Sequence, residues 1–366
     1  MSDFWNTRTK NLSPYIPGEQ PRDRQFIKLN TNENPYPPSP KVIEAIKNAA
    51  DEKLRLYPDP ECTQLREAIA ARYGVRKEQV FAGNGSDEIL GFAFGAFFES
   101  TAVGSGIEKP APILFPDITY SFYPVYADLW DIPFSTVPLC EEFYIRADEY
   151  KIECGGVVLP NPNAPTGIEI RIEDLLSLAD YLEKQGKVLI VDEAYVAFSG
   201  GETQSIIPFI NKHPNMLVVH TLSKSASLAG LRVGFAIGNE KLIEGLCRIR
   251  DSFNSYTLDR LALAGATAAI LDSEYYDEIN GKVIDTRDRV KNVLRGLGFD
   301  VLESAANFLF IKPPIIGGEE LFTALREKGI LTRHFNKDRI KDFLRVSIGT
   351  DKEMDTFLAA CRELLG

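Results

Sequence analysis

A single lysine, Lys224, stands in a short run of hydroxyl residues where a reactive amine could lie. Ser223 and Ser225 flank it, the apolar residues 217–219 precede it, and Arg232 follows eight positions later. A lysine attacks a carbonyl only when its amine can lose a proton, which burial and nearby cations favour. Hydroxyls and an arginine can bind a phosphate, because a guanidinium donates paired hydrogen bonds. Taken alone, a stretch of this kind is more often an ordinary surface lysine beside a turn.

An acidic residue, Asp192, follows a predicted strand of apolar residues at 188–191. Burying a carboxylate there is costly unless it has a cationic partner. A protonated pyridine nitrogen would be such a partner, and keeping that nitrogen protonated makes the ring an electron sink. Pyridoxal phosphate joins this ring to an aldehyde, which suits Lys224, and to a phosphate, which suits Arg232. The alternative is that Asp192 only caps a helix.

Two further loops follow predicted strands at 80–82 and 157–159. The first, GNGSDE at 83–88, combines glycines that allow close backbone approach with a helix start whose free N–H groups suit a phosphate. Alternatively it is a plain turn with Ser86 as the N-cap. The second, PNPNAPTG at 160–167, is a stiff loop rich in proline. Loops at the carboxyl ends of strands meet at the ligand site of an α/β sheet.

Short apolar strands alternating with helices predict an α/β fold with a mostly parallel sheet. A clear amphipathic helix spans 172–185, and a charged helix is predicted over 275–298. The remaining strands of the predicted large sheet are 113–115, 132–137, 217–221 and 234–237.

The length of 366 residues suggests two domains. We expect a proline-rich N-terminal arm at residues 1–40, a large domain at 41–271, and a smaller α+β domain at 272–366. The apolar and aromatic residues of the arm favour packing onto the small domain over a disordered tail.

The net charge of −11 and the pI near 5.0 argue against nucleic acid or an anionic membrane as a main partner. An anionic ligand would therefore need a local arginine site. The five cysteines form no CxxC pair, which fits a reducing compartment, and the chain is expected to be cytoplasmic. The three histidines show no metal-ligand spacing and no Ser/His/Asp arrangement is evident, so neither a metal site nor a hydrolase is predicted; His220 is expected to be a core residue.

Together the P-T-G loop, D-E-A-Y at 192–195 and T-L-S-K at 221–224 with R-x-G-F behind it resemble the fold-type I pyridoxal-phosphate enzymes of the aspartate-aminotransferase type. The resemblance covers nearly the whole chain and implies a mostly parallel seven-stranded sheet with a smaller α+β domain. The segments KLNTNENPYPPSP, LYPDPE and LRVSIGT are similar to those of the histidinol-phosphate aminotransferases, a subfamily of class I and II aminotransferases.

This resemblance implies roles for individual residues around pyridoxal phosphate. Lys224 would form the Schiff base and move a proton, Asp192 would pair with the pyridine nitrogen, and Tyr195 would donate to the phenolic oxygen. Tyr120 would stack on the ring, unless it is a core aromatic residue. The phosphate would be bound by six residues, the last of them from the other subunit of a homodimer: Ser86, Asp87, Thr221, Ser223, Arg232 and Tyr57.

One position departs from the pattern of many relatives, which have an asparagine immediately before P-T-G. Here Ala164 occupies that place and Asn163 precedes it. Either Asn163 takes over the contact with the phenolic oxygen or Tyr195 makes it alone; we favour Asn163.

The resemblance also implies transfer of an amino group between histidinol phosphate and 2-oxoglutarate. Arg333 and Arg345 would bind the substrate anions, and Tyr15 and Asn32 of the arm would close over the ligand. Both arginines could instead be solvated charges, although Arg345 lies between two apolar residues.

Three other functions compete with this aminotransferase activity. A threonine-phosphate decarboxylase and an aromatic-amino-acid aminotransferase would share the fold and the cofactor. A non-catalytic regulator with this fold is disfavoured, because the arm has no helix-turn-helix pattern and the net charge is acidic.

Overall fold

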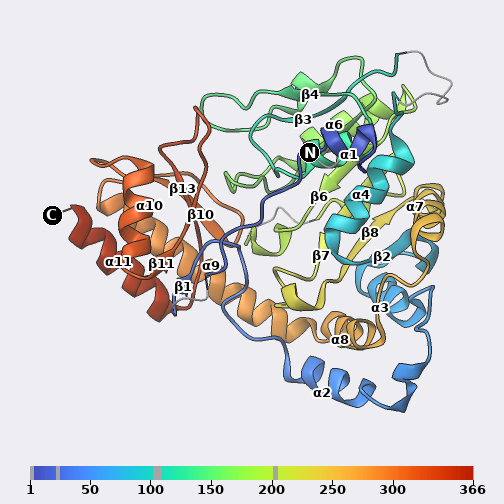
Figure 1. Cartoon of the computed structure of the whole chain (residues 1–366), viewed down its shortest axis with the longest axis horizontal. Coiled ribbons are helices and arrows are strands. Elements are labelled where there is room, and N and C mark those ends of the chain that lie inside the picture. Colours follow the sequence, from blue (N-terminus) through green and yellow to red (C-terminus); the bar gives the residue numbers. More distant parts are fainter. Residues whose placement is uncertain (1–3, 22–24, 102–108, 201–204, 366) are drawn as a thin grey trace.

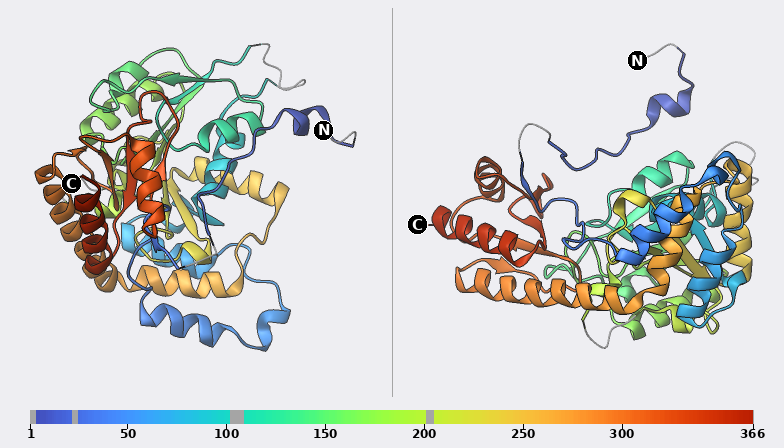
Figure 2. Two further views of the ribbon diagram at one scale, coloured as in Figure 1. Left: turned by 60° about the vertical axis from the view of Figure 1, so that its left-hand side comes forward. Right: turned by 90° about the horizontal axis from the view of Figure 1, so that it is seen from below.

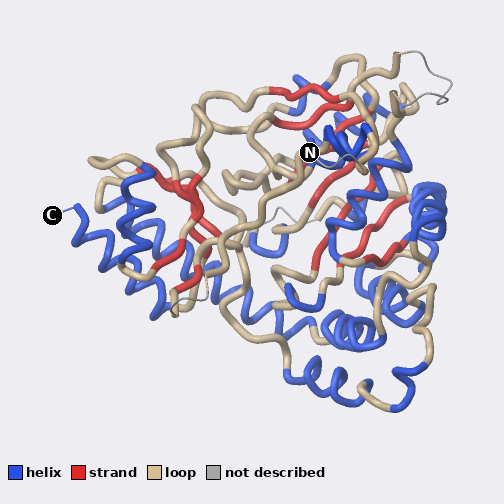
Figure 3. The backbone as a smooth tube through the Cα atoms, viewed as in Figure 1, coloured by secondary structure: helices blue, strands red, loops and turns tan. Residues whose placement is uncertain are grey.

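A seven-stranded sheet lies at the centre of the larger part of the molecule (Figure 1, Figure 3). The computed structural model describes residues 4–21, 25–101, 109–200 and 205–365. The strands are β2 (Val80–Gly83), β3 (Ile113–Pro116), β4 (Phe134–Val137), β5 (Gly156–Pro160), β6 (Leu189–Asp192), β7 (Met216–Thr221) and β8 (Gly234–Gly238). Their order is β2-β8-β7-β6-β5-β3-β4, and β8 is antiparallel to both of its neighbours. The sheet is therefore mostly parallel, as predicted.

Helices cover both faces of this sheet, which is why its strands are apolar on both sides. One face packs against α4 (Gly85–Phe97), α5 (Tyr123–Leu129) and α7 (Glu240–Phe253). The other packs against α3 (Thr63–Tyr73), α6 (Ile172–Glu183) and α8 (Arg260–Leu271), with α2 (Pro40–Ala49) lying on α8. Side chains alternate along each strand, so neighbouring residues of β6 or β7 contribute to opposite faces. This alternation decides which residues reach the ligand site.

A smaller sheet lies at the C-terminal end of the chain, in the order β12-β13-β10-β9. Its strands are β9 (Asp300–Val301), β10 (Phe308–Lys312), β12 (Arg333–His334) and β13 (Leu344–Ser347). Three helices pack with it: α9 (Ser273–Gly296), α10 (Gly318–Glu327) and α11 (Asp351–Leu365). Figure 2 shows that the long helix α9 runs from the large sheet to this smaller unit.

The N-terminal arm carries α1 (Thr7–Asn11) and β1 (Ile27–Lys28). β1 runs parallel to β11 (Ile330–Leu331) of the C-terminal unit, so the two ends of the chain meet there. The predicted domain limits at residues 40 and 271 remain a prediction, although this pairing agrees with an arm that joins the C-terminal part.

Helix ends follow the local sequence closely. Ser39 caps α2 as predicted, because its side chain accepts a hydrogen bond from the N–H of Lys41. The predicted strand 132–137 begins only at Phe134, since the preceding proline has no N–H for the ladder. α9 runs from 273 to 296 instead of 275 to 298, and Gly298 after it has φ +86°. Within the described ranges, no helix combines the length and the apolar character needed to span a bilayer.

Candidate active site

The carboxyl ends of β5, β6 and β7 meet the start of α4 around a cavity of about 500 Å³. Parallel neighbouring strands end at the same edge of a sheet, so residues far apart in sequence meet there. The cavity is lined by Gln20, Thr31, Glu33, Ser86, Asp87, Tyr120, Pro160, Pro162, Ala164, Asp192, Ala194, Tyr195, Thr221, Ser223, Lys224, Ala229, Gly230 and Arg232. The sequence-predicted residues at 86, 87, 120, 192, 195, 221, 223, 224 and 232 thus line one cavity.

Lys224 lies in the turn after β7, and its Nζ donates a hydrogen bond to the carbonyl of Thr31, 3.0 Å away. Burial, together with the nearby cation of Arg345, lowers the pKa of Lys224 to about 8. A substantial fraction of the amine is therefore neutral near pH 7 to 8. Such an amine can attack a carbonyl carbon, which an ordinary surface lysine does poorly.

Asp192 is buried at the end of β6 and lines the same cavity as Lys224. Its Oδ2 accepts a hydrogen bond from the hydroxyl of Tyr123 at 3.0 Å, and its Oδ1 accepts one from the N–H of Ala194 at 3.2 Å. Burial nevertheless raises the pKa of Asp192 to about 6. The carboxylate would therefore gain from a bound cation such as a protonated ring nitrogen.

Arg232 forms a cationic corner beside the start of α4. Its guanidinium donates to Oγ of Ser223 at 3.3 Å and to a carboxylate oxygen of Asp87 at 2.9 Å. Gly85, with φ +77°, makes room for it, because a Cβ there would lie 2.6 Å from Nη2 of Arg232. Helix-start N–H groups, hydroxyls and a guanidinium in one place suit a phosphate.

The carboxylate of Asp87 is already engaged at this corner. Besides the contact with Arg232, it accepts a hydrogen bond from the hydroxyl of Tyr120 at 2.6 Å. Its negative charge would repel a phosphate, so any contribution of Asp87 to phosphate binding would come from its backbone N–H. Its side chain instead orients Arg232 and the ring of Tyr120.

The arm reaches the cavity through Gln20, Thr31 and Glu33, whereas Asn32, which does not line it, contacts the cavity residue Tyr195. The side-chain amide of Asn32 donates to the hydroxyl oxygen of Tyr195 at 3.0 Å. Asn32 has φ +58° and is held by Ser347 of β13, whose Oγ accepts from the N–H of Asn32 at 2.8 Å. The arm thereby connects the small sheet to the ligand cavity.

Arg333 and Arg345 face each other directly across the β12–β13 ladder. Like charges in that register repel, so the pair creates a site that favours an anion. Arg345 donates to the carbonyl of Asn30 at 2.9 Å, while its Nε makes no hydrogen bond. Burial lowers the pKa of Arg345, and Arg333 lowers it further. This partly buried cation with a free donor is suited to a substrate phosphate or carboxylate.

Six predicted residues do not line the cavity of this chain: Asn32, Arg333 and Arg345, described above, and Tyr57, Tyr15 and Asn163. Tyr57 is 78% exposed and stacks on Tyr256, with ring centroids 4.6 Å apart. Tyr15 stacks on Phe122 at 4.3 Å. Asn163 is buried behind the wall and donates to the carbonyl of Ile118 at 3.0 Å.

The preference for Asn163 as the contact to the phenolic oxygen is therefore not supported. Ala164 takes the place on the cavity wall. Proline residues on both sides of the Asn163–Ala164 pair fix the loop backbone, so the two side chains cannot simply exchange places. Tyr195 is left as the residue able to donate there.

Sequence reasoning missed Tyr123, the fully buried donor to Asp192. Tyr123 stands three residues after Tyr120, and this short spacing between two tyrosines is the signal in the sequence that could have found it. Reasoning from sequence also missed the carbonyl of Thr31 and the cavity residues Gln20 and Glu33, which the arm supplies.

One group of possible metal ligands occurs among the described residues. Asp180, Glu183 and His213 have ligand atoms within 4.8 Å of one another. His213 precedes β7, so this group lies at the amino ends of the parallel strands, at the edge of the sheet opposite the cavity. It takes no part in the candidate active site.

Known proteins resemble this chain over its full length. Residues 24–360 match the sequence profile of the aminotransferase class I and II family. The chain belongs to this family. It is 52% identical to the histidinol-phosphate aminotransferase of Clostridium acetobutylicum over 365 residues, which cover 100% of both chains. It is 49% identical to the enzyme of that name from Aromatoleum aromaticum, again over 100% of both.

Solved structures of the family share the fold. Histidinol-phosphate aminotransferase from Sinorhizobium meliloti, in complex with pyridoxal-5'-phosphate, superimposes with a TM-score of 0.86 at 23% identity, over 100% of this chain and 98% of that chain. A solved structure of the histidinol-phosphate aminotransferase from Clostridium acetobutylicum gives a TM-score of 0.81 at 22% identity, over 93% of this chain and 99% of that chain. The predicted fold class is confirmed.

The cavity fits pyridoxal phosphate, the cofactor expected of this family. Asp192 is a buried acid that needs a cation, Lys224 is an amine with a lowered pKa, and Arg232, which packs closely over Gly85, is a cation that can pair with a phosphate. These three features lie at different parts of one cavity, as a ring with an aldehyde and a phosphate requires.

The lowered pKa of Lys224 predicts how its reactivity changes with pH. In cofactor-free protein, labelling of Lys224 by an amine-reactive reagent should rise with pH and reach half its maximum near pH 8. Quantitative mass spectrometry of the labelled peptide measures this, and Lys224→Met identifies the peptide. A midpoint at about 10.4, the ordinary lysine value, would contradict the proposed environment.

Proposed function

We propose that the chain is a histidinol-phosphate aminotransferase that transfers an amino group between L-histidinol phosphate and 2-oxoglutarate. The products are imidazole acetol phosphate and glutamate, in histidine biosynthesis. The observation that carries the proposal is about 50% identity over the full length to relatives of that name. The filled positions around the cavity support it.

Bound pyridoxal phosphate would supply an aldehyde and an electron-withdrawing ring that stabilises negative charge on the substrate carbon. Lys224 would hold the aldehyde carbon in the resting enzyme, and then, freed by the substrate amine, move the proton at the substrate carbon. Its lowered pKa suits both tasks, because a base should be poised near the working pH.

Asp192 would hold the protonated ring nitrogen, and Tyr123 and the N–H of Ala194 would keep the carboxylate in place. Tyr195, oriented by Asn32, would donate to the phenolic oxygen. Tyr120 would lie against the ring face, with its hydroxyl fixed by Asp87. The phosphate would be bound by Arg232, Thr221, Ser223, Ser86 and the helix start.

Arg345 and Arg333 would receive the substrate anion, a phosphate in one half-reaction and a carboxylate in the other. A guanidinium can pair with either group through two donors, so one site can serve both. Tyr15 would close over the ligand by moving with the arm. The stacking of Tyr15 on Phe122 places it near Tyr120, whose ring lies 5.6 Å from that of Phe122.

We further propose a homodimer in which Tyr57 of each chain completes the partner's phosphate site. Exposed apolar side chains occur on the segment that leads to Tyr57 and on the segment of Tyr256, which stacks on it, and this is unusual for a surface facing only water. They are Leu54, Leu56, Phe253 and Tyr256.

The five cysteines are all unpaired, which supports a reducing, cytoplasmic location.

The central test is a substrate assay on purified protein. Glutamate formation from histidinol phosphate and 2-oxoglutarate should be fast, with no carbon dioxide released from threonine phosphate. Lys224→Ala should reduce transamination to below about one thousandth of the wild-type rate and abolish the visible absorption of the cofactor–lysine bond. Carbon dioxide release from threonine phosphate as the faster reaction would show that the chain is a decarboxylase instead.

Arg345→Ala tests the anion site. Removing a charge-assisted hydrogen bond should lower kcat/KM for histidinol phosphate by about 100-fold, while the cofactor dissociation constant changes by less than about three-fold. Arg345→Lys keeps the charge but loses the paired donors, so its kcat/KM for histidinol phosphate should lie between those of the wild type and Arg345→Ala. A large loss of cofactor affinity would assign Arg345 to the cofactor's phosphate.

Mixed dimers test the role of Tyr57. Lys224→Ala and Tyr57→Phe chains, each impaired alone, should regain activity when unfolded together and refolded as a mixture. A dimer of one chain of each kind contains one site with both Lys224 and Tyr57 intact. Activity that equals the average of the two parent variants would show that Tyr57 acts within its own chain.

A further inference from the structure

A buried acid–imidazole pair lies directly behind the active site. Nε2 of His220 and Oε2 of Glu193 are 2.8 Å apart, and the carboxylate can only accept, so the imidazole donates. Glu193 follows Asp192, and His220 precedes Thr221. Because side chains alternate along a strand, the pair points away from the cavity into which its neighbours point.

The pair is the last tie between β6 and β7 before the two strands separate. Their backbone ladder ends with Asp192 opposite Val219, followed by one hydrogen bond from the N–H of Glu193 to the carbonyl of Val219 at 2.8 Å. Beyond that point the chain after β6 turns into the short helix at 196–198, while β7 continues to Thr221. The side-chain bond therefore spans the place where the backbone bonds stop.

Its surroundings hold both partners in one position. The imidazole of His220 stacks on Phe235, with centroids 4.9 Å apart, and meets the edge of Tyr73 at 5.6 Å. The second carboxylate oxygen of Glu193 accepts from the N–H of Ile206 at 2.8 Å. Glu193 is 1% exposed and His220 is 7% exposed, so loss of either partner would leave a buried polar group unsatisfied.

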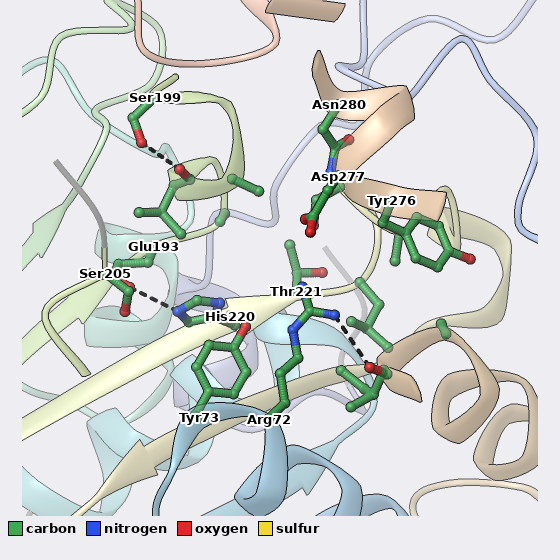
Figure 4. A pocket seen from close by; sticks show the side chains of 18 of the residues that line it. Arg72, Tyr73, Glu193, Ser199, Ser205, His220, Thr221, Tyr276, Asp277 and Asn280 are labelled. Atoms are coloured by element: carbon green, nitrogen blue, oxygen red, sulfur yellow. Dashed lines mark hydrogen bonds and ion pairs between the residues drawn. The ribbon is translucent and has the colours of Figure 1, made fainter. Parts of the chain in front are cut away.

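A second cavity, of about 440 Å³, opens onto this pair (Figure 4). Figure 4 shows the imidazole of His220 and the carboxylate of Glu193 at its wall, with Tyr73 and Arg72 beside them. Thr221 belongs to the walls of both cavities, so the two spaces are separated only by the ends of β6 and β7. A small molecule can thus reach the pair without passing through the active site.

We infer that Glu193 and His220 are positioning residues that fix the spacing between Asp192 on one strand end and the Thr221–Lys224 turn on the other. These two elements hold opposite ends of the cofactor in the proposed function, on which this inference rests. The pair itself touches neither cofactor nor substrate. Its loss should allow the two strand ends to move apart and weaken the grip on the cofactor.

Cofactor affinity measured on cofactor-free protein is the decisive quantity. His220→Ala and Glu193→Ala should each raise the dissociation constant of pyridoxal phosphate by about ten-fold or more, since one buried partner is left unpaired. His220→Gln keeps a donor near the place of Nε2 and should stay within about three-fold of wild type. A wild-type dissociation constant for His220→Ala would overturn the inference.

A double variant separates positioning from stability. Replacing both members by apolar residues, in Glu193→Leu with His220→Phe, should recover part of the melting temperature lost in either alanine variant of the cofactor-free protein, because neither side chain of the pair is left unpaired and only the N–H of Ile206 loses its acceptor. Cofactor affinity should stay low, because the tie between the strand ends is still missing. If the double variant recovered its melting temperature and its cofactor affinity together, the pair would serve folding alone.

The second cavity allows chemical rescue. Added imidazole should enter it, fill the space left in His220→Ala and restore cofactor affinity, but it should have no effect on Glu193→Ala, which lacks the acceptor. Failure of imidazole to improve affinity in a folded His220→Ala protein would count against a direct role of the imidazole group.

His213 provides a matched control. It is also a buried histidine beside a carboxylate, with Nδ1 3.1 Å from Oδ1 of Asp180, but at the opposite edge of the sheet. His213→Ala should alter melting without altering cofactor affinity. If wild-type protein bound no pyridoxal phosphate, the proposed function would fail; if wild type bound it and His220→Ala bound it equally well, only this inference would fail.

Discussion

Two buried ionisable groups of opposite kind face one cavity without pairing with each other. Lys224 donates to a backbone carbonyl and Asp192 accepts from Tyr123, while burial lowers the pKa of the first and raises that of the second. Each group is therefore held in a state that costs free energy in the empty site. A ligand that is cationic toward the acid and electrophilic toward the amine relieves both costs. The chemistry of the family follows from this constraint.

The parallel arrangement of β6 and β7 produces this constraint, and the N-terminal arm completes it. Thr31 accepts from the amine of Lys224, and the side chain of Asn34 donates to the Lys224 backbone carbonyl at 3.2 Å. Asn32 is bound to Ser347 of the small sheet. A shift of the C-terminal unit relative to the large sheet would therefore be felt at the reactive amine, through Thr31, Asn32 and Asn34 of one short segment.

The two proposed anion sites are built in different ways. Around Arg232 the cation is balanced by Asp87 and supported by a helix start, an arrangement suited to a permanently bound phosphate. Arg333 and Arg345 instead repel each other across a ladder, and Arg345 keeps a free donor. An unbalanced site of this kind favours an anion that arrives and leaves, as substrates must.

The sequence by itself determined the fold class, the strand ends that carry Asp192 and Lys224, and the glycine-rich loop at residues 83–88 that starts a helix. These features depend on local patterns: apolar runs, breaks after them, and residue types whose chemistry is specific. Only the tertiary structure decided that Tyr123 holds Asp192, that Asn163 points behind the wall, and that Glu193 meets His220. Those contacts join side chains from separate elements, and their directions depend on strand register and loop path, which no local pattern specifies.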